Sequence, residues 1–196
     1  MAELRVKTPI TDEDICRMKL GDNVFLTGVV HTARDEAHGR ILEYLSQGRK
    51  IPFDLNGGVI FHCGPIAKKI NGRWSVVSAG PTTSSRMNRL QPEVLEKCGV
   101  KAVIGKGGMS EDVLKSLKNN NAVYLAVTGG AAALISERIK KVLAVNWLDV
   151  GMPEAVWALE VKDLGPLTVA MINGKSLYSG VERRVSVNLN RLIQNL

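Results

Sequence analysis

Short runs of β-branched and other apolar residues alternate with longer amphipathic stretches along the chain. Val24 to Thr32, Gly57 to Cys63 and Trp74 to Ala79 are typical of strands, and the last two are expected to be neighbours across an Asn-Gly-containing connection. A short helix is expected after Thr11, because the acidic residues that follow it suit a first helical turn. A second helix is expected from Arg34 to near Gly48.

From Pro92 onward the pattern becomes a regular alternation of helices and strands. The expected elements are a helix to Lys97, a strand Lys101 to Ile104, a helix Ser110 to Lys118, a strand Ala122 to Val127, a helix Ala131 to Ile139, strands at Val142 to Trp147, Ala155 to Val161 and Leu167 to Ile172, a hairpin turn at Asn173-Gly174 into Ser176 to Ser179, and an amphipathic helix Val181 to Leu196. This rhythm predicts an α/β fold with mixed sheets and glycine-rich strand-to-helix turns. With no internal repeat and no linker, residues 1–196 are expected to form a single domain.

Composition and charge narrow the class of partner. The chain of 196 residues is 45% hydrophobic, and its net charge of +7 suits an anionic partner. Its basic residues are scattered and are not interleaved with aromatic residues, so no nucleic-acid partner is expected. The most apolar stretch, Ala122 to Ile135, is too short to span a bilayer, and the N-terminus has no apolar leader. We therefore expect a cytoplasmic protein without membrane contact.

The three cysteines, Cys16, Cys63 and Cys98, are widely spaced and form no CxxC pair. An odd, dispersed set argues against a disulfide framework and for a reducing compartment. Three cysteines could hold an iron–sulfur cluster in principle, but these fall in unlike predicted elements. The sequence favours small buried hydrophobic residues, and no metal site is predicted on this chain.

The segment Gly80 to Met87, GPTTSSRM, carries the most specific chemistry. Its Gly-Pro pair predicts a sharp turn, after which Thr82 to Ser85 would form the N-cap and first turn of a helix. Hydroxyl groups and free backbone N–H groups at such a place attract anions, and Arg86 adds a planar cation about one helical turn beyond Thr82. The alternative is an ordinary helix cap with a surface arginine.

Two other segments could contribute to the same site. Ile104 to Met109, IGKGGM, places Lys106 between glycines directly after a strand, which suits a ligand-binding or proton-transfer group, or a plain turn. Arg34 and His38 share one face of a predicted helix and could line a cleft at the end of a strand, or be a surface arginine and an internally bonded histidine. A third glycine-rich turn, Gly129-Gly130, suits close approach of a ligand or subunit, or tight packing.

Seven motifs occur together and in order: KTPITDEDICRMKLGD (Lys7 to Asp22), HTARDEAH (His31 to His38), GGVIFHCGP (Gly57 to Pro65), SAGPTTSSRM (Ser78 to Met87), IGKGGM, DVGMPEA (Asp149 to Ala155) and NGKSLY (Asn173 to Tyr178). With them the chain resembles, over nearly its full length, the β subunit of two-subunit class I fumarate hydratase and equally that of L(+)-tartrate dehydratase.

The resemblance implies a swivelling three-layer β/β/α domain that forms half of an active site. The other half would lie on an α subunit that carries a [4Fe–4S] cluster, in an α2β2-type assembly, so this chain would hold no cluster cysteine. It also implies a hydro-lyase that interconverts (S)-malate and fumarate plus water, or, as the alternative, one that converts tartrate to oxaloacetate. By matching positions, Thr82 would be the catalytic base, Arg34, Arg86 and Lys106 would bind the substrate carboxylates, and His38 would lie near the substrate.

The residues themselves suit this chemistry. A dicarboxylate needs several fixed cations, and Arg34, Arg86 and Lys106 supply three. Dehydration also requires removal of a proton beside a carboxylate, and a threonine hydroxyl does this only if its pKa is lowered, so Lys106 is the rival of Thr82 as base. A non-catalytic anion-binding domain is a further alternative. The absence of GxxxxGK[ST] and GxGxxG from the sequence argues against a phosphate binder.

Overall fold

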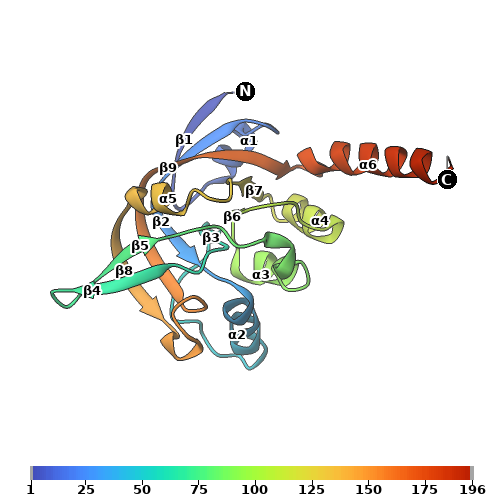
Figure 1. Ribbon diagram of the computed structural model, residues 1–196. Helices are drawn as coiled ribbons and strands as arrows, with labels where there is room; N and C mark the ends of the chain where they lie inside the picture. The colour runs from blue at the N-terminus through green and yellow to red at the C-terminus, as the bar shows by residue number, and fades with distance from the viewer. Residues whose placement is uncertain (1, 195–196) are drawn as a thin grey trace.

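Strands and helices alternate through the computed structural model of the protein, which describes residues 2–194 (Figure 1). The strands are β1 (Glu3–Lys7), β2 (Asn23–Thr32), β3 (Val59–Phe61), β4 (Ile66–Ile70), β5 (Arg73–Ser78), β6 (Ala102–Gly105), β7 (Val123–Ala126), β8 (Ile139–Asn146), β9 (Val156–Ile172) and β10 (Lys175–Ser176). The helices are α1 (Asp12–Arg17), α2 (Asp35–Ser46), α3 (Gln91–Cys98), α4 (Glu111–Asn119), α5 (Ala132–Arg138) and α6 (Leu177–Gln194), with short 3-10 turns η1 (Ser84–Met87) and η2 (Leu148–Val150).

The α/β fold class predicted from the sequence is confirmed. The swivelling three-layer arrangement and the single domain over residues 1–196 stay predictions.

The main sheet closes on itself. Strands β1, β2, β3, β6 and β7 are parallel to one another, and β9 runs antiparallel to both β7 and β2. Thr168 of β9 faces Ala126 of β7 and also Asn23 of β2, so the circuit β2–β3–β6–β7–β9 is complete. In this circuit β2, β3, β6 and β7 end at the same edge, where α/β proteins commonly bind ligands.

Both faces of the central strands are buried. Val59 and Phe61 of β3 point into a core enclosed by the strand circuit, whereas Ile60 between them points to a second core under the helices. Helices α2, α3 and α4 lie side by side over this second core (Figure 1). Burial on both sides explains why these strands are continuous apolar runs instead of strictly alternating ones.

Two strand predictions were wrong. The strands expected at Ala155 to Val161 and Leu167 to Ile172 form the single strand β9, because the segment between them stays paired with β2 through Leu164. Strand β5 is not a neighbour of β3. It pairs with β4, which the sequence did not predict, in a separate hairpin with a turn at Asn71-Gly72, where both residues have positive φ. Strand β4 gives little sequence signal because only Ala67 in it is buried.

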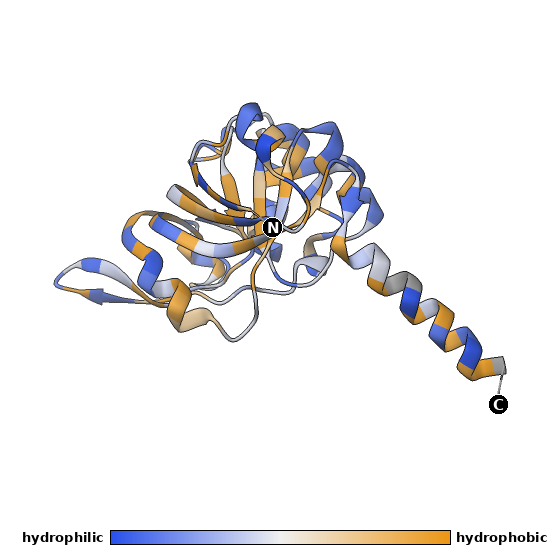
Figure 2. Cartoon of the chain, turned by 90° about the horizontal axis from the view of Figure 1, so that it is seen from above, coloured by the Kyte–Doolittle hydropathy of each residue, from blue (hydrophilic) through white to orange (hydrophobic). Residues whose placement is uncertain are grey.

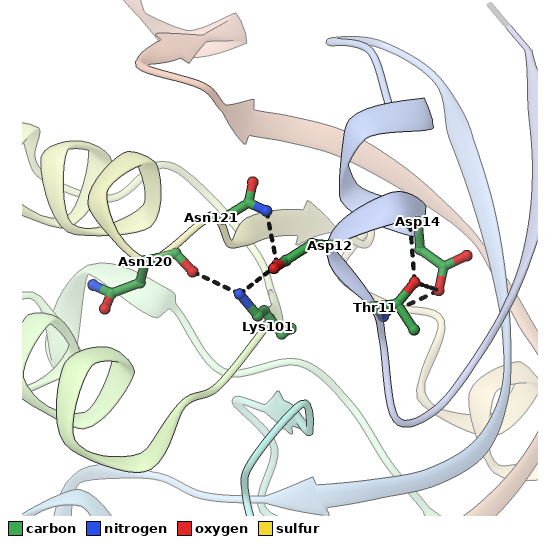
Figure 3. Close-up of polar contacts among 6 residues, drawn as sticks. All are labelled: Thr11, Asp12, Asp14, Lys101, Asn120 and Asn121. Carbon is green, nitrogen blue, oxygen red and sulfur yellow. Dashed lines mark hydrogen bonds and ion pairs between the residues drawn. The ribbon is translucent and has the colours of Figure 1, made fainter.

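Helix α1 is fixed at its start and against the α4–β7 turn (Figure 3). The Thr11 hydroxyl accepts a hydrogen bond from the Asp14 N–H, and the Asp14 carboxylate accepts one from the Thr11 N–H, which confirms the predicted cap. Asp12 lies 2.7 Å from the Lys101 ammonium and accepts a hydrogen bond from the Asn121 side chain at 2.8 Å. These contacts, with Lys101 the larger cause, hold the pKa of Asp12 below its usual range.

The C-terminal helix α6 projects from the rest of the protein (Figures 1 and 2). It begins at Leu177, so the strand expected over Ser176 to Ser179 is wrong: β10 comprises only Lys175 and Ser176. The last residues of the predicted helix lie outside those described. Orange, hydrophobic segments recur along α6 in Figure 2. The exposed large apolar residues of this helix are Leu177, Val181, Val185, Val187, Leu189, Leu192 and Ile193. Most are three or four residues apart and therefore share one face. In residues 2–194 no helix combines the length and apolar character needed to cross a bilayer.

Candidate active site

The segment Gly80 to Met87, here called the strap, crosses the ends of the parallel strands. Pro81 bridges to Cys63 just after β3, and Thr83 bridges to Lys106 just after β6. The Thr82 N–H donates to the His62 carbonyl at 2.7 Å. Backbone pairing with two strand ends therefore fixes this segment.

The helix predicted to start at Thr82 to Ser85 is wrong. Only the 3-10 turn η1 forms here, and α3 begins later, at Gln91. The backbone N–H of Ser84 donates to the Lys106 carbonyl at 3.0 Å, and that of Thr82 is also bonded, so neither is free to bind an anion. The hydroxyl residues suggested a helix cap, but pairing with neighbouring strands satisfied the same backbone groups instead.

Arg34 is held at the start of α2. Its Nη2 lies 3.1 Å from Oε1 of Glu154, whose other oxygen accepts a hydrogen bond from the Glu36 N–H at 3.2 Å. Gly64 lies directly against the guanidinium, where a Cβ would collide with Nη1. The Nε group of Arg34 is buried and has no hydrogen-bond partner in the described part of the chain. The Arg34 side chain is thus fixed by its surroundings, with one buried donor left unsatisfied.

Arg86 is placed beside Arg34 by a second ion pair. Its Nε and Nη2 lie 3.2 and 2.8 Å from the two oxygens of Asp35, the residue after Arg34. The first contact is a hydrogen bond and the second an ion-pair contact, and the Arg86 side chain is 49% exposed. The structure therefore brings both predicted arginines to the start of α2, each oriented by a carboxylate.

Lys106 and Thr82 flank the same strap. The Lys106 side chain passes over Gly129, and its Cδ and Nζ would lie 3.8 and 4.0 Å from a Cβ at that position. These are ordinary van der Waals distances, so the approach of a ligand or subunit expected at this third glycine-rich turn stays a prediction. Within residues 2–194, no hydrogen bond or ion pair involves the Lys106 ammonium or the Thr82 hydroxyl. Both groups remain available, and their catalytic roles stay predictions.

His38 lies behind the site, fully buried, in a polar network that the sequence did not predict. Its Nδ1 lies 2.7 Å from the Arg34 carbonyl oxygen and its Nε2 3.1 Å from Oε1 of Gln91. Both ring nitrogens are engaged inside the protein, so contact of His38 with a substrate stays a prediction. The other members are His62, Ser84, Gln91 and Tyr124. His62 and Tyr124, as polar side chains within apolar strand runs, are the signal that could have revealed it.

Burial keeps the histidines neutral. It lowers the pKa of His31, His38 and His62, which are the only three in the sequence. The effect is largest for His62, whose pKa falls to about 3, first through burial and then through the nearby ring of His38. The two rings have centroids 5.4 Å apart, so one charge there would oppose a second.

The three cysteines differ in their burial. Cys63 is buried as predicted, and burial raises the pKa of its thiol to about 12, while Cys98 is partly buried with a pKa raised to about 11 by the same cause. Cys16 is exposed, which corrects the prediction that all three are buried. A cluster binds thiolates, which these pKa values disfavour. In residues 2–194 no three His, Cys, Asp or Glu side chains are placed to hold a metal ion.

Comparison with known proteins places this geometry in context. A family described as Fumarase C-terminus matches residues 1–181. The chain is 49% identical over 186 residues to a Methanocaldococcus jannaschii protein provisionally named L(+)-tartrate dehydratase subunit beta, covering 94% of this chain and 95% of that protein. It is 42% identical over 164 residues to the Escherichia coli L(+)-tartrate dehydratase subunit beta, covering 84% and 80%.

A longer relative is also similar. The chain is 40% identical over 181 residues to a Geobacillus stearothermophilus protein provisionally named fumarate hydratase class I. The match covers 92% of this chain but 34% of that protein, so the chain spans about a third of its length.

The neutral histidines predict a pH-dependent stability. The folded pKa of His62 is about 3, below the ordinary value of 6.5, so between pH 6.5 and about 3 the unfolded chain binds a proton that the folded chain does not. The free energy of unfolding should fall as pH is lowered through this window, with His62 contributing up to ~1.4 kcal/mol per pH unit. Urea unfolding of wild type and His62→Asn at several pH values measures this. Equal slopes for the two proteins would contradict the prediction.

Proposed function

The chain belongs to the fumarase C-terminus family, and we propose that it is the β subunit of a two-subunit hydro-lyase that interconverts (S)-malate and fumarate plus water. The observation that carries the proposal is the gathering of Arg34, Arg86 and Lys106 around one strap at the ends of parallel strands. This is the number and kind of cations that a small dicarboxylate requires.

Tartrate is the second candidate substrate. Two of the relatives described above carry the name of an L(+)-tartrate dehydratase β subunit, at 49% and 42% identity. Tartrate also presents two carboxylates to the same cations, and its dehydration to oxaloacetate is the same class of reaction. The choice between malate and tartrate therefore depends on contacts with the substrate hydroxyl groups.

The proposed binding mode uses the two arginines as forks and the lysine as a point charge. Arg34 would bind a carboxylate through the exposed part of its guanidinium, and Arg86 would exchange or share its contact with Asp35. Glu154 and Asp35 keep the guanidinium planes oriented before substrate arrives, which lowers the entropy cost of binding. A partner surface that excludes water from this open edge would strengthen each of these interactions.

Proton transfer falls to Thr82 or Lys106 in this proposal. Elimination of water from malate removes a proton from the carbon beside one carboxylate, and the resulting aci-carboxylate gains negative charge that Arg34, Arg86 and Lys106 would stabilise. The Thr82 hydroxyl is held in place by its own backbone bond to His62 and could accept the proton if neighbouring cations lower its pKa. Lys106 in its neutral form is the alternative base.

We further propose that the other half of the elimination, the departure of the substrate hydroxyl group, would be assisted by an α subunit that carries a [4Fe–4S] cluster, in an α2β2-type assembly. In support, no three His, Cys, Asp or Glu side chains within residues 2–194 are placed to hold a metal ion, and burial raises the pKa of the Cys63 and Cys98 thiols. The exposed apolar face of α6 supports the existence of a partner, because side chains such as Val181, Val185 and Leu192 favour coverage by another protein.

The proposal is tested by reconstitution. The purified chain should be colourless and inactive, whereas anaerobic mixing with a cluster-bearing α subunit should give oxygen-sensitive dehydration, measured with malate, tartrate and a methylated dicarboxylate. The preferred acid decides the substrate. A brown, active preparation of this chain alone that loses its colour when Cys16, Cys63 and Cys98 are replaced by serine would overturn the division of labour, and inactivity of the complex on all three acids would overturn the function.

Arg86→Lys in the assembled enzyme should lower kcat/KM, with a loss of transition-state stabilisation of at least ~2 kcal/mol. The reason is that an ammonium cannot make the two-point contact with a carboxylate that a guanidinium can. Arg5→Lys is the matched control, since Arg5 of β1 also pairs with an aspartate, Asp163 of β9, through a side chain that is 70% exposed. Steady-state kinetics of both variants make the comparison. An unchanged rate for Arg86→Lys would show that Arg86 is a surface residue.

Thr82→Val keeps the shape of the side chain and removes its hydroxyl. If Thr82 is the base, kcat should fall by at least about 100-fold with little change in KM, because general acid–base catalysis supplies rate enhancements of this order. The same substitution at exposed Thr83, one residue along the strap, is the control. A preserved kcat in Thr82→Val would transfer the role to Lys106 or to a residue of the partner.

A further inference from the structure

Five buried side chains form an unbroken path between two backbone carbonyls at the candidate site. The path starts at the Arg34 carbonyl and passes through His38, Gln91, His62, Ser84 and Tyr124 to the Gly107 carbonyl, over six contacts of 2.7, 3.1, 2.7, 2.9, 2.9 and 2.9 Å. His38, His62, Ser84, Gln91 and Tyr124 each have no measurable exposure. Water therefore cannot supply missing hydrogen bonds, and the path must be satisfied from within.

Counting hydrogens decides how the path is arranged. Six contacts need six hydrogens, and the two terminal carbonyls supply none. With neutral rings, His38, His62, Ser84 and Tyr124 each supply one, which leaves two to come from Gln91. An amide NH2 group has two hydrogens, whereas an amide oxygen has none. The oxygen and nitrogen of a glutamine have nearly the same shape, so the hydrogen count rather than position must assign them.

The alternative is costly. If the Gln91 oxygen faced the histidines, both rings would have to be imidazolium ions, buried and with centroids 5.4 Å apart. It would also leave the Gln91 NH2 group buried without a partner, as it is in that orientation. Rotating the Gln91 amide by 180° turns its NH2 group toward the histidines and leaves its oxygen at the position without a partner. A buried carbonyl oxygen without a partner is better tolerated than a buried NH2 group without one.

We propose that Gln91 is a positioning residue that donates both amide hydrogens, one to Nε2 of His38 and one to Nε2 of His62. Every other hydrogen is then fixed. His38 donates from Nδ1 to the Arg34 carbonyl, and His62 donates from Nδ1 to Ser84. The Ser84 hydroxyl donates to the oxygen of Tyr124, whose hydroxyl donates to the Gly107 carbonyl. Both histidines are therefore neutral and carry their hydrogen on Nδ1.

The path ties together the segments that carry the proposed substrate-binding groups, so its functional meaning rests on the proposed function. One end fixes the backbone of Arg34, the middle fixes the strap through Ser84, and the other end fixes the loop after Lys106. Gly105 is part of the same arrangement, because a Cβ there would overlap the Ser84 hydroxyl. Gln91 thereby sets where two cations stand relative to each other without touching a substrate.

Nitrogen-15 NMR of the histidine rings in the full 196-residue chain tests the assignment directly. We expect protonated Nδ1 and unprotonated Nε2 in both His38 and His62 throughout pH 6 to 8. A hydrogen on Nε2 of either ring, or a doubly protonated ring at neutral pH, would overturn it. This spectrum does not depend on activity, so it distinguishes failure of the hydrogen-bond path from failure of the proposed function.

A matched pair of substitutions adds a second reading. Gln91→Glu offers at most one hydrogen where the amide offers two, so at least one histidine must gain a hydrogen on Nε2 and its spectrum must change. Gln47→Glu is the control, because Gln47 is exposed at the end of α2 and, within residues 2–194, its side chain bonds only Glu43. In the reconstituted enzyme we expect kcat/KM to fall at least about tenfold for the first variant and to stay unchanged for the second. Unchanged spectra in Gln91→Glu would contradict the proposal.

Discussion

The pairing of β9 with both β2 and β7 is the constraint on which the rest of the structure depends. Thr168 faces Asn23 on one side and Ala126 on the other, and this double pairing turns a row of strands into a closed circuit. Closure encloses the larger core, in which Trp157 of β9 is fully buried. It also leaves β2, β3 and β6 no freedom to slide, because a slip of one residue would exchange the apolar side chains of the two cores.

The site follows from this closure and from the way its polar groups are satisfied. The strap from Gly80 to Met87 forms only the 3-10 turn η1, and its backbone is held by the ends of β3 and β6. Behind it, polar side chains replace apolar packing and link elements that are far apart in the chain. Such a network is stable only when every member has a partner, so it holds its surroundings to one arrangement. Polar contacts also orient the two arginines in front of the network, because Arg34 pairs with Glu154 and Arg86 with Asp35.

The sequence predicted most elements because long apolar runs and capping residues are local signals. Thr11 is the helix cap that the acidic residues after it predict, and the apolar residues of the strands under the helices predict those strands. The break expected within β9 and the helix expected at Thr82 were wrong because pairing with distant strands outweighed local preference. Arg34, Arg86 and Lys106 were found from motifs and charge. The partners of His62, Ser84 and Gln91 are 22 to 53 residues away, and no local pattern encodes such contacts.

The position of the projecting helix α6 has a consequence for the loop at its base. Its 18 residues extend over about 27 Å at 1.5 Å per residue. At its base the ring of Tyr178 packs against Gly108, so closely that a Cβ there would lie 3.1 Å from the ring. Gly108 stands two residues beyond Lys106. A protein that covers the exposed face of α6 would therefore bind an element whose first turn packs directly on the glycine-rich loop after Lys106.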